Sequence, residues 1–136
     1  MSDGTLRVLG ILLAVYQVSP PSLIAIEEPE ASIHPAALEV LVDILKSGSH
    51  KTQILITTHS PDILDYKNIR DEEIMVVESI RGNATVAPIS WGARDMIRQH
   101  LYLPGELLRS GELEPDRHEA SIRAKQLNLF GPVKHK

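Results

Sequence analysis

Two short, uninterrupted aliphatic runs that each end in a cluster of polar residues constrain this chain most. Residues 23–26 (LIAI) are followed at once by the acidic sequence EEPE, and residues 53–58 (QILITT), whose aliphatic part is ILI, run into the polar cluster Thr58-His59-Ser60. Continuous apolar runs of this length indicate strands buried on both faces, which are typical of the middle of a parallel sheet. In such sheets ligands bind beyond the carboxyl ends of the strands, so we expect both polar clusters to lie there.

Helical patterns precede and separate the two runs. Residues 5–17 have so high an apolar content that they predict a deeply buried helix. Its apolar residues at helical spacing form the stripe Leu6, Leu9, Leu13 and Tyr16, which Val8, Ile11, Leu12 and Val15 widen. A second helix is expected to begin at Pro35, a residue suited to the first helical turn, and to end near Gly48.

The second half of the chain predicts a strand pair followed by helices. Residues 74–78 and 84–89 read as strands, and the turn signal Arg81-Gly82-Asn83 between them predicts a β-hairpin. Residues 91–108 show a helical pattern that is broken near Pro104. Buried strands that alternate with helices indicate an α/β fold with mainly parallel core strands.

Composition narrows the classes of protein that fit. The chain has no cysteine, which excludes disulfides, thiol chemistry and cysteine-based zinc sites. No apolar run approaches the roughly 18–20 residues that span a bilayer. The first ten residues lack the features of a signal peptide, so we expect a cytoplasmic protein. A net charge of −4 argues against a uniformly basic surface that would coat nucleic acid.

Three polar constellations could carry chemistry. Adjacent carboxylates at Glu27 and Glu28 suit a hydrated Mg²⁺, and one of them could orient a water. His59 could contact a phosphate oxygen, and the segment Ser2-Asp3-Gly4 before a helix could bind an anion. The alternatives are a solvated acidic loop, a capping histidine and an ordinary capped helix start.

Taken together, the three constellations resemble a known family. MSDGTLRVLGILLAV resembles the signature motif and signature helix of ABC-type ATPases in their SMC-, RecF- and OLD-like branch. LIAIEEPEASIHP is similar to the Walker B strand, catalytic glutamate and D-loop of that branch, and QILITTHSPDILD to its switch-histidine strand. LPGELLRSGEL resembles the C-terminal end of predicted AAA-type ATPases of the same group. The resemblance covers residues 1–113 and leaves residues 114–136 as a polar, mobile tail.

The resemblance implies a role for each matching residue, with ATP and Mg²⁺ as cofactors. Glu27 would hold Mg²⁺ at the Walker B position, Glu28 would polarise the attacking water, and His59 would contact the γ-phosphate. Ser2, Asp3 and Gly4 would form the signature motif, which in this family contacts ATP held by the opposite subunit. Residues 30–34 would form the D-loop, which communicates across an ATPase dimer. The implied architecture is a partial P-loop NTPase of three layers, ABC ATPase-like, with a C-terminal β-hairpin.

The Walker A loop of the family, GxxxxGK[ST], does not occur in these residues. We therefore interpret the chain as the C-terminal half of an ATPase domain that cannot bind ATP alone in the family's manner. In the family the Walker A strand lies beside the switch-histidine strand, so its absence leaves an open edge at residues 53–58. Because unpaired strand edges recruit other strands, we expect re-pairing within the chain, self-association as a homodimer, or a Walker A-bearing partner.

Two further interpretations stay open from the sequence. One is a metal-dependent nuclease or phosphatase built on Glu27, Glu28 and Glu30. The other is a non-enzymatic truncated subunit or interaction module that pairs with a Walker A-bearing partner. Binding to nucleic acid, and a setting in DNA repair or phage defence, rest on family analogy alone.

Overall fold

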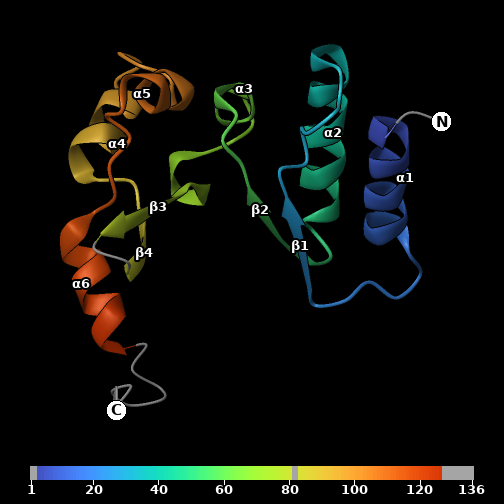
Figure 1. Cartoon of the computed structure of the whole chain (residues 1–136), viewed down its shortest axis with the longest axis horizontal. Helices are drawn as coiled ribbons and strands as arrows, with labels where there is room; N and C mark the ends of the chain where they lie inside the picture. Colours follow the sequence, from blue (N-terminus) through green and yellow to red (C-terminus); the bar gives the residue numbers. More distant parts are fainter. Residues whose placement is uncertain (1–2, 81–82, 127–136) are drawn as a thin grey trace. The chain divides into compact units, whose positions relative to one another are not determined.

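The computed structural model describes residues 3–80 and 83–126, and the chain forms two compact units, Met1–Tyr66 and Lys67–Lys136. The first unit alternates helices and strands, as the sequence predicts (Figure 1). In chain order its elements are α1 (Asp3–Tyr16), β1 (Leu23–Glu27), α2 (Pro35–Gly48), β2 (Gln53–Thr57) and α3 (Pro61–Leu64).

The two strands of the first unit run parallel, which confirms the predicted strand pair. Their register runs from Leu23 opposite Gln53 to Glu27 opposite Thr57, so both strands end at the same level. A parallel pair needs a crossover connection, and α2 supplies it. His34 caps the start of α2 by accepting a hydrogen bond at Nδ1 from the Ala36 N–H at 3.2 Å, as expected for a helix-start residue.

The core of the first unit lies between the strands and two helices. Figure 1 shows α1 and α2 on the same side of β1 and β2. The buried side chains of this core are Ile11, Val15, Ile24, Leu41 and Leu45. The unit taken alone therefore has two layers, and the predicted third layer stays a prediction.

The prediction that both strands are buried on both faces is wrong for this unit. Ile24 is 8 % exposed and faces the helices, whereas Leu23 and Leu55 are 48 % and 52 % exposed. Successive strand residues point to opposite faces, and in the described part of the unit the helices cover one of them. The aliphatic run therefore carries one buried face and one apolar face that is open to solvent.

The predicted core face of α1 also differs from the observed one. Leu6, Leu9, Leu13 and Tyr16 lie between 44 % and 66 % exposed, while Ile11 and Val15 are 7 % and 5 % exposed. Gly48 on α2 explains the choice of face, because a Cβ at this position would lie 2.5 Å from Cγ1 of Val15. The glycine lets Val15 pack directly on the backbone of α2, so the residues that only widened the predicted stripe form the core.

A second glycine brings the start of α1 against the loop that follows β1. A Cβ at Gly4 would lie 2.1 Å from the backbone oxygen of Ser32. Ser32 itself has a φ of 64°, in the left-handed region that L side chains rarely adopt. The loop backbone therefore approaches the helix at a point where only glycine fits.

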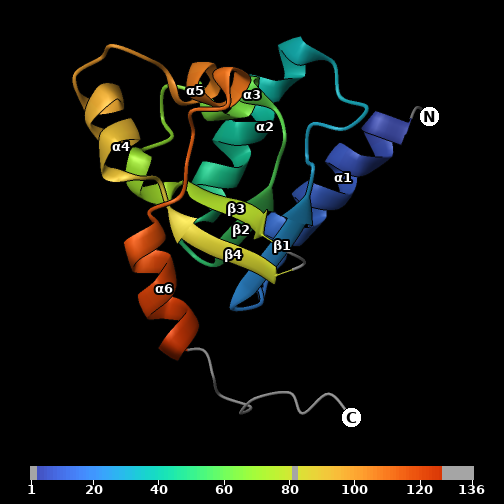
Figure 2. The same ribbon diagram turned by 60° about the vertical axis from the view of Figure 1, so that its left-hand side comes forward.

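The second unit contains the predicted hairpin. Its elements are η1 (Asp71–Glu73), β3 (Met75–Ile80), β4 (Asn83–Pro88), α4 (Trp91–Arg98), α5 (Pro104–Ser110) and α6 (Arg117–Gln126). The strands β3 and β4 pair antiparallel, and α6 packs on β4 (Figure 2). Arg98 and Arg94 form ion pairs with Asp71 at 2.9 and 3.2 Å, which tie α4 to η1.

Two predictions for the second half meet the structure only in part. Helix α6 lies within the segment predicted as a polar tail, and Ala120 on it is buried at 6 % exposure. Arg81 and Gly82 of the turn signal, and residues 127–136 of the tail, lie outside the described residues. The division of the chain at residue 113 stays a prediction.

The strands do not re-pair across the two units. In the described ranges β2 pairs with β1 and β3 pairs with β4. The outer edge of β2 is thus left for another strand, and the predicted association stays a prediction. None of the helices described is long and apolar enough to cross a bilayer.

A pair of substitutions on α1 tests which of its faces is buried. We expect Ile11→Ala to lower the free energy of unfolding by about 2–5 kcal/mol, because it leaves a cavity in the core. We expect Leu13→Ala, on the exposed face, to change it by less than about 0.5 kcal/mol. Urea denaturation followed by circular dichroism measures both. Equal losses would contradict the observed orientation of α1.

A second pair tests the close approach at Gly4. We expect Gly4→Ala to destabilise the fold by about 1–3 kcal/mol, because the new methyl group overlaps the Ser32 carbonyl. The control Gly10→Ala lies on the same helix with no atom within 4 Å of its Cβ position. There the gain in helix propensity predicts a stabilisation of about 0.5–1 kcal/mol. Opposite signs in thermal denaturation support the contact, and stabilisation by both changes would refute it.

Candidate functional site

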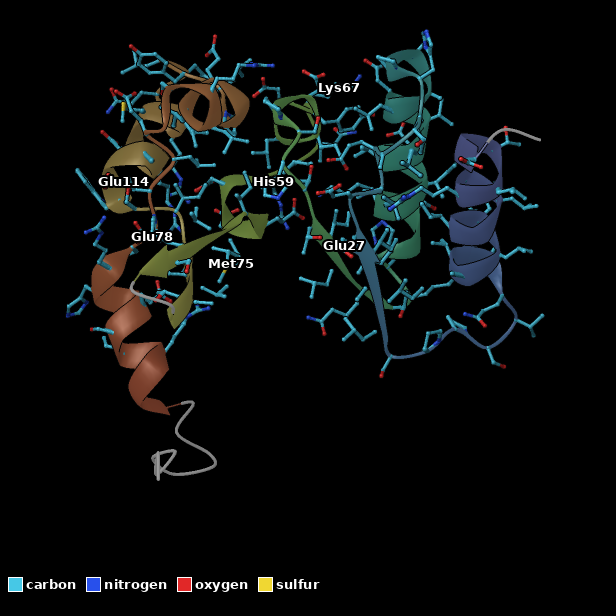
Figure 3. The ribbon with its side chains drawn as sticks, in the orientation of Figure 1. Glu27, His59, Lys67, Met75, Glu78 and Glu114 are labelled. Carbon is cyan, nitrogen blue, oxygen red and sulfur yellow. The ribbon has the colours of Figure 1, made fainter. Side chains whose placement is uncertain are left out.

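The carboxyl ends of β1 and β2 bring the two polar clusters of the sequence together. Glu27 ends β1 opposite Thr57 at the end of β2, and the N–H of Glu28 donates to the Thr57 carbonyl at 2.8 Å. The residues that follow each strand therefore start from neighbouring positions. Figure 3 labels Glu27 and His59, which come from these two strand ends.

Glu28 and His59 face each other at this edge. The Nε2 atom of His59 lies 3.8 Å from Oε1 of Glu28. The His59 side chain is 92 % exposed and that of Glu28 is 46 % exposed, so both can reach a ligand from solvent. The structure thus brings together the two residues predicted to be catalytic, at a separation slightly longer than a hydrogen bond.

The loop after β1 is folded tightly by its own backbone. Glu28 has a φ of 42°, in the left-handed region, where a residue with a side chain is uncommon. The carbonyl of Glu28 accepts from the Ala31 N–H, and that of Glu30 from the Ile33 N–H, each at 3.0 Å. These turns hold Glu28 in a conformation that the loop would not adopt as an extended chain.

Glu30 reaches across from this loop to the loop after β2. The Thr58 hydroxyl donates to Oε1 of Glu30 at 2.5 Å and accepts from the Ser60 N–H at 2.9 Å. The second oxygen of Glu30, Oε2, is buried without a hydrogen-bond partner in the described structure. Glu30 therefore serves as a contact between loops, a role that the sequence analysis, which placed it in the D-loop or in an alternative metal site, did not predict.

The start of α1 lies close to the same loop. Gly4 is buried against the Ser32 carbonyl, Asp3 is exposed at the first position of the helix, and Ser2 lies outside the described residues. The guanidinium of Arg7 donates to the backbone carbonyl of Glu27. The predicted signature segment therefore contacts the predicted Walker B segment, while its role in binding nucleotide stays a prediction.

The carboxylates at the strand end suit a hard cation in their chemistry. Glu27 is exposed, and in the described parts of the chain no Lys or Arg forms an ion pair with the Glu27 or Glu28 carboxylate. Oxygen ligands with room for several waters are the environment that Mg²⁺ prefers. Among the residues described, no three His, Asp or Glu side chains gather closely enough to hold a metal by themselves.

Two residues of this site escaped the sequence analysis. Thr58 was noted as part of a polar cluster without a role, and Arg7 was not singled out. Arg7 follows Gly4 by three positions, which places both near one face of α1. That spacing was the one available signal that Arg7 would point toward the loop after β1.

Comparisons with known proteins find similarity over the first unit. Residues 1–65 match the family described as "AAA domain, putative AbiEii toxin, Type IV TA system". Over 57 residues the chain is 38 % identical to the chromosome partition protein Smc of Mycoplasma genitalium, which covers 42 % of this chain and 6 % of that protein. The chromosome partition protein Smc of Mycoplasma pneumoniae is 36 % identical over 57 residues, with the same shares covered.

A solved structure extends the likeness to the fold. It comes from work described as "Structural biochemistry of ATP-driven dimerization and DNA stimulated activation of SMC ATPases", and it superposes with a TM-score of 0.54 at 17 % identity. The match covers 74 % of this chain and 62 % of that chain, so the chain spans only part of its relatives. Residues 1–65 are thus similar to this AAA domain family, and the fold of the chain is similar to part of that solved structure.

Proposed function

We propose that this chain supplies the magnesium-binding and water-activating part of an ATP-hydrolysing site of the SMC type. The observation that carries the proposal is the approach of His59 to Glu28, at 3.8 Å, beside Glu27 at the end of β1. Two carboxylates and an imidazole at one sheet edge are the residue types that the family resemblance assigns to the Walker B, catalytic glutamate and switch-histidine positions, and this supports the proposal.

Each of the three side chains has a separate task in this proposal. Glu27 would hold the Mg²⁺ of a bound ATP, which neutralises phosphate charge. Glu28 accepts a hydrogen bond, and in the reaction a proton, from the attacking water. His59 donates a hydrogen bond to a phosphoryl oxygen. Phosphoryl transfer depends mainly on positioning and on charge neutralisation, so groups on short rigid connections to a sheet suit it.

The phosphates themselves need a further binding element. These residues contain no GxxxxGK[ST] loop, whose backbone N–H groups and Lys would cradle them. We propose that a segment outside these residues, on the same polypeptide or on another, supplies that loop and pairs with the open edge of β2. ATP-driven dimerization and DNA-stimulated activation, the properties named for the structural relative, are extended to this chain as part of the same proposal.

ATP turnover with and without a complementing polypeptide tests the proposal. We expect the chain alone to show no turnover above background. A mixture with the Walker A-bearing N-terminal half of an SMC-like ATPase domain should hydrolyse ATP in the presence of Mg²⁺. In that mixture Glu28→Gln should lower kcat by about 10²–10⁴-fold, the usual contribution of a general base.

Matched variants distinguish the loss of a site residue from the general effects of a mutation on the fold. Glu39→Gln makes the same chemical change on an exposed residue of α2, and it should leave kcat within about twofold because surface changes usually have small effects. His59→Ala should reduce turnover, whereas His118→Ala on α6 should not. Full activity of Glu28→Gln would refute the assigned mechanism. Cleavage of DNA with Mg²⁺ and without ATP would instead support a metal-dependent nuclease.

A further inference from the structure

We infer that Thr58 and Glu30 form a latch between the two loops of the site that positions His59 against Glu28. The latch consists of the hydrogen bonds that join Glu30, Thr58 and the backbone N–H of Ser60. The effect of the latch on catalysis rests on the proposed function, whereas its effect on the geometry of the two loops does not.

The direction of each hydrogen bond in the latch is fixed by its partners. The N–H of Ser60 can only donate, so the Thr58 hydroxyl oxygen accepts it at 2.9 Å. The single hydroxyl proton of Thr58 is then directed to Oε1 of Glu30 at 2.5 Å. Valine, which has nearly the shape of threonine, cannot make either bond. Serine keeps both, so the chain offers a variant that breaks the latch and one that preserves it.

The latch holds the chain on both sides of His59 and close to Glu28. Thr58 precedes His59 and Ser60 follows it, while Glu30 lies two residues after Glu28. The His59 side chain is 92 % exposed and that of Glu28 is 46 % exposed, so little packing fixes their relative positions. The backbone of the two loops must therefore set their separation, and the latch is a side-chain hydrogen bond that joins those loops.

The burial of Glu30 makes loss of its hydrogen bond to Thr58 energetically unfavourable. Oε2 of Glu30 is buried and has no hydrogen-bond partner in the described structure, so the carboxylate depends on the bond to Thr58. An unpaired carboxylate in such a place is strongly disfavoured. If the latch is lost, Glu30 should move toward water and take the loop that carries Glu28 with it. Thr58 and Glu30 are thus positioning residues, which act through His59 and Glu28.

Nuclear magnetic resonance of the chain without nucleotide tests the geometry directly. At fixed pH, Glu28→Gln should shift the ring signals of His59, which a His59→Gln variant identifies. In the Thr58→Val background this shift should fall to less than about half, because charge interactions weaken with distance. In the Thr58→Ser background it should be retained. Thr57→Val, the same change on the exposed neighbouring residue, is the matched control and should retain it too.

Amide hydrogen exchange provides a second readout that needs no activity. Exchange at the Ser60 N–H should become about tenfold faster in Thr58→Val, because its hydrogen-bond acceptor is removed. Glu30→Ala should also speed exchange at Ser60, although the hydrogen bond from Ser60 is to Thr58. This second variant keeps the test decisive if Thr58→Val does not fold.

The complemented ATPase mixture then measures the catalytic consequence. Thr58→Val should lower kcat by about 10–100-fold with little change in the KM for ATP, because misplaced groups slow chemistry more than binding. Thr58→Ser should restore kcat. If Thr58→Val changes neither the His59 ring signals nor the exchange at Ser60, the latch is overturned, whatever turnover is measured. If both readouts respond and the mixture shows no turnover, the latch stands and the proposed function fails.

Discussion

The parallel pairing of β1 with β2 is the interaction on which the rest of the first unit depends. Its register sets Glu27 opposite Thr57, so both chains leave the sheet at the same level and in the same direction. A shift of one residue would turn every side chain of one strand to the opposite face and remove Ile24 from the core. The register that buries the aliphatic side chains is therefore the same one that brings Glu28 and His59 together.

The helices and strands of the first unit could be predicted from the sequence, but the faces that they bury could not. Helices and strands of the first unit were predicted because capping residues, Pro35 and the abrupt polar ends of the strands mark their limits. The buried face of α1 could not be chosen from periodicity, because leucines lie on both sides of the helix. The choice depends on Gly48 of the neighbouring helix, which leaves space for Val15. The strands were predicted as buried on both faces for a related reason, since an aliphatic run does not show what covers it.

Part of the candidate site could also be predicted from the sequence, and part depends on tertiary contacts. Glu27, Glu28 and His59 could be predicted because residues that follow parallel strands share one edge. The bond between Thr58 and Glu30 could not, because Glu30 lies in a loop whose backbone is left-handed at Glu28 and Ser32, and the sequence does not predict that conformation. Such conformations cost about 1–3 kcal/mol each and persist only where neighbouring contacts enforce them. The hydrogen bonds within the loop and the contact of Gly4 with Ser32 are the contacts that do so.

The exposure of Glu28 and His59 weakens the interaction between them. The His59 side chain is 92 % exposed, and charge interactions between exposed groups are weak because solvent screens them. A covering surface that excluded solvent would lower the effective dielectric constant and strengthen the electrostatic interactions of these groups. The open edge of β2 and the apolar outer face that carries Leu55 offer a covering segment both backbone pairing and hydrophobic contact. A segment that paired along β2 and also lay over Leu55 would satisfy backbone hydrogen bonds at the edge and bury apolar surface on the outer face of this unit.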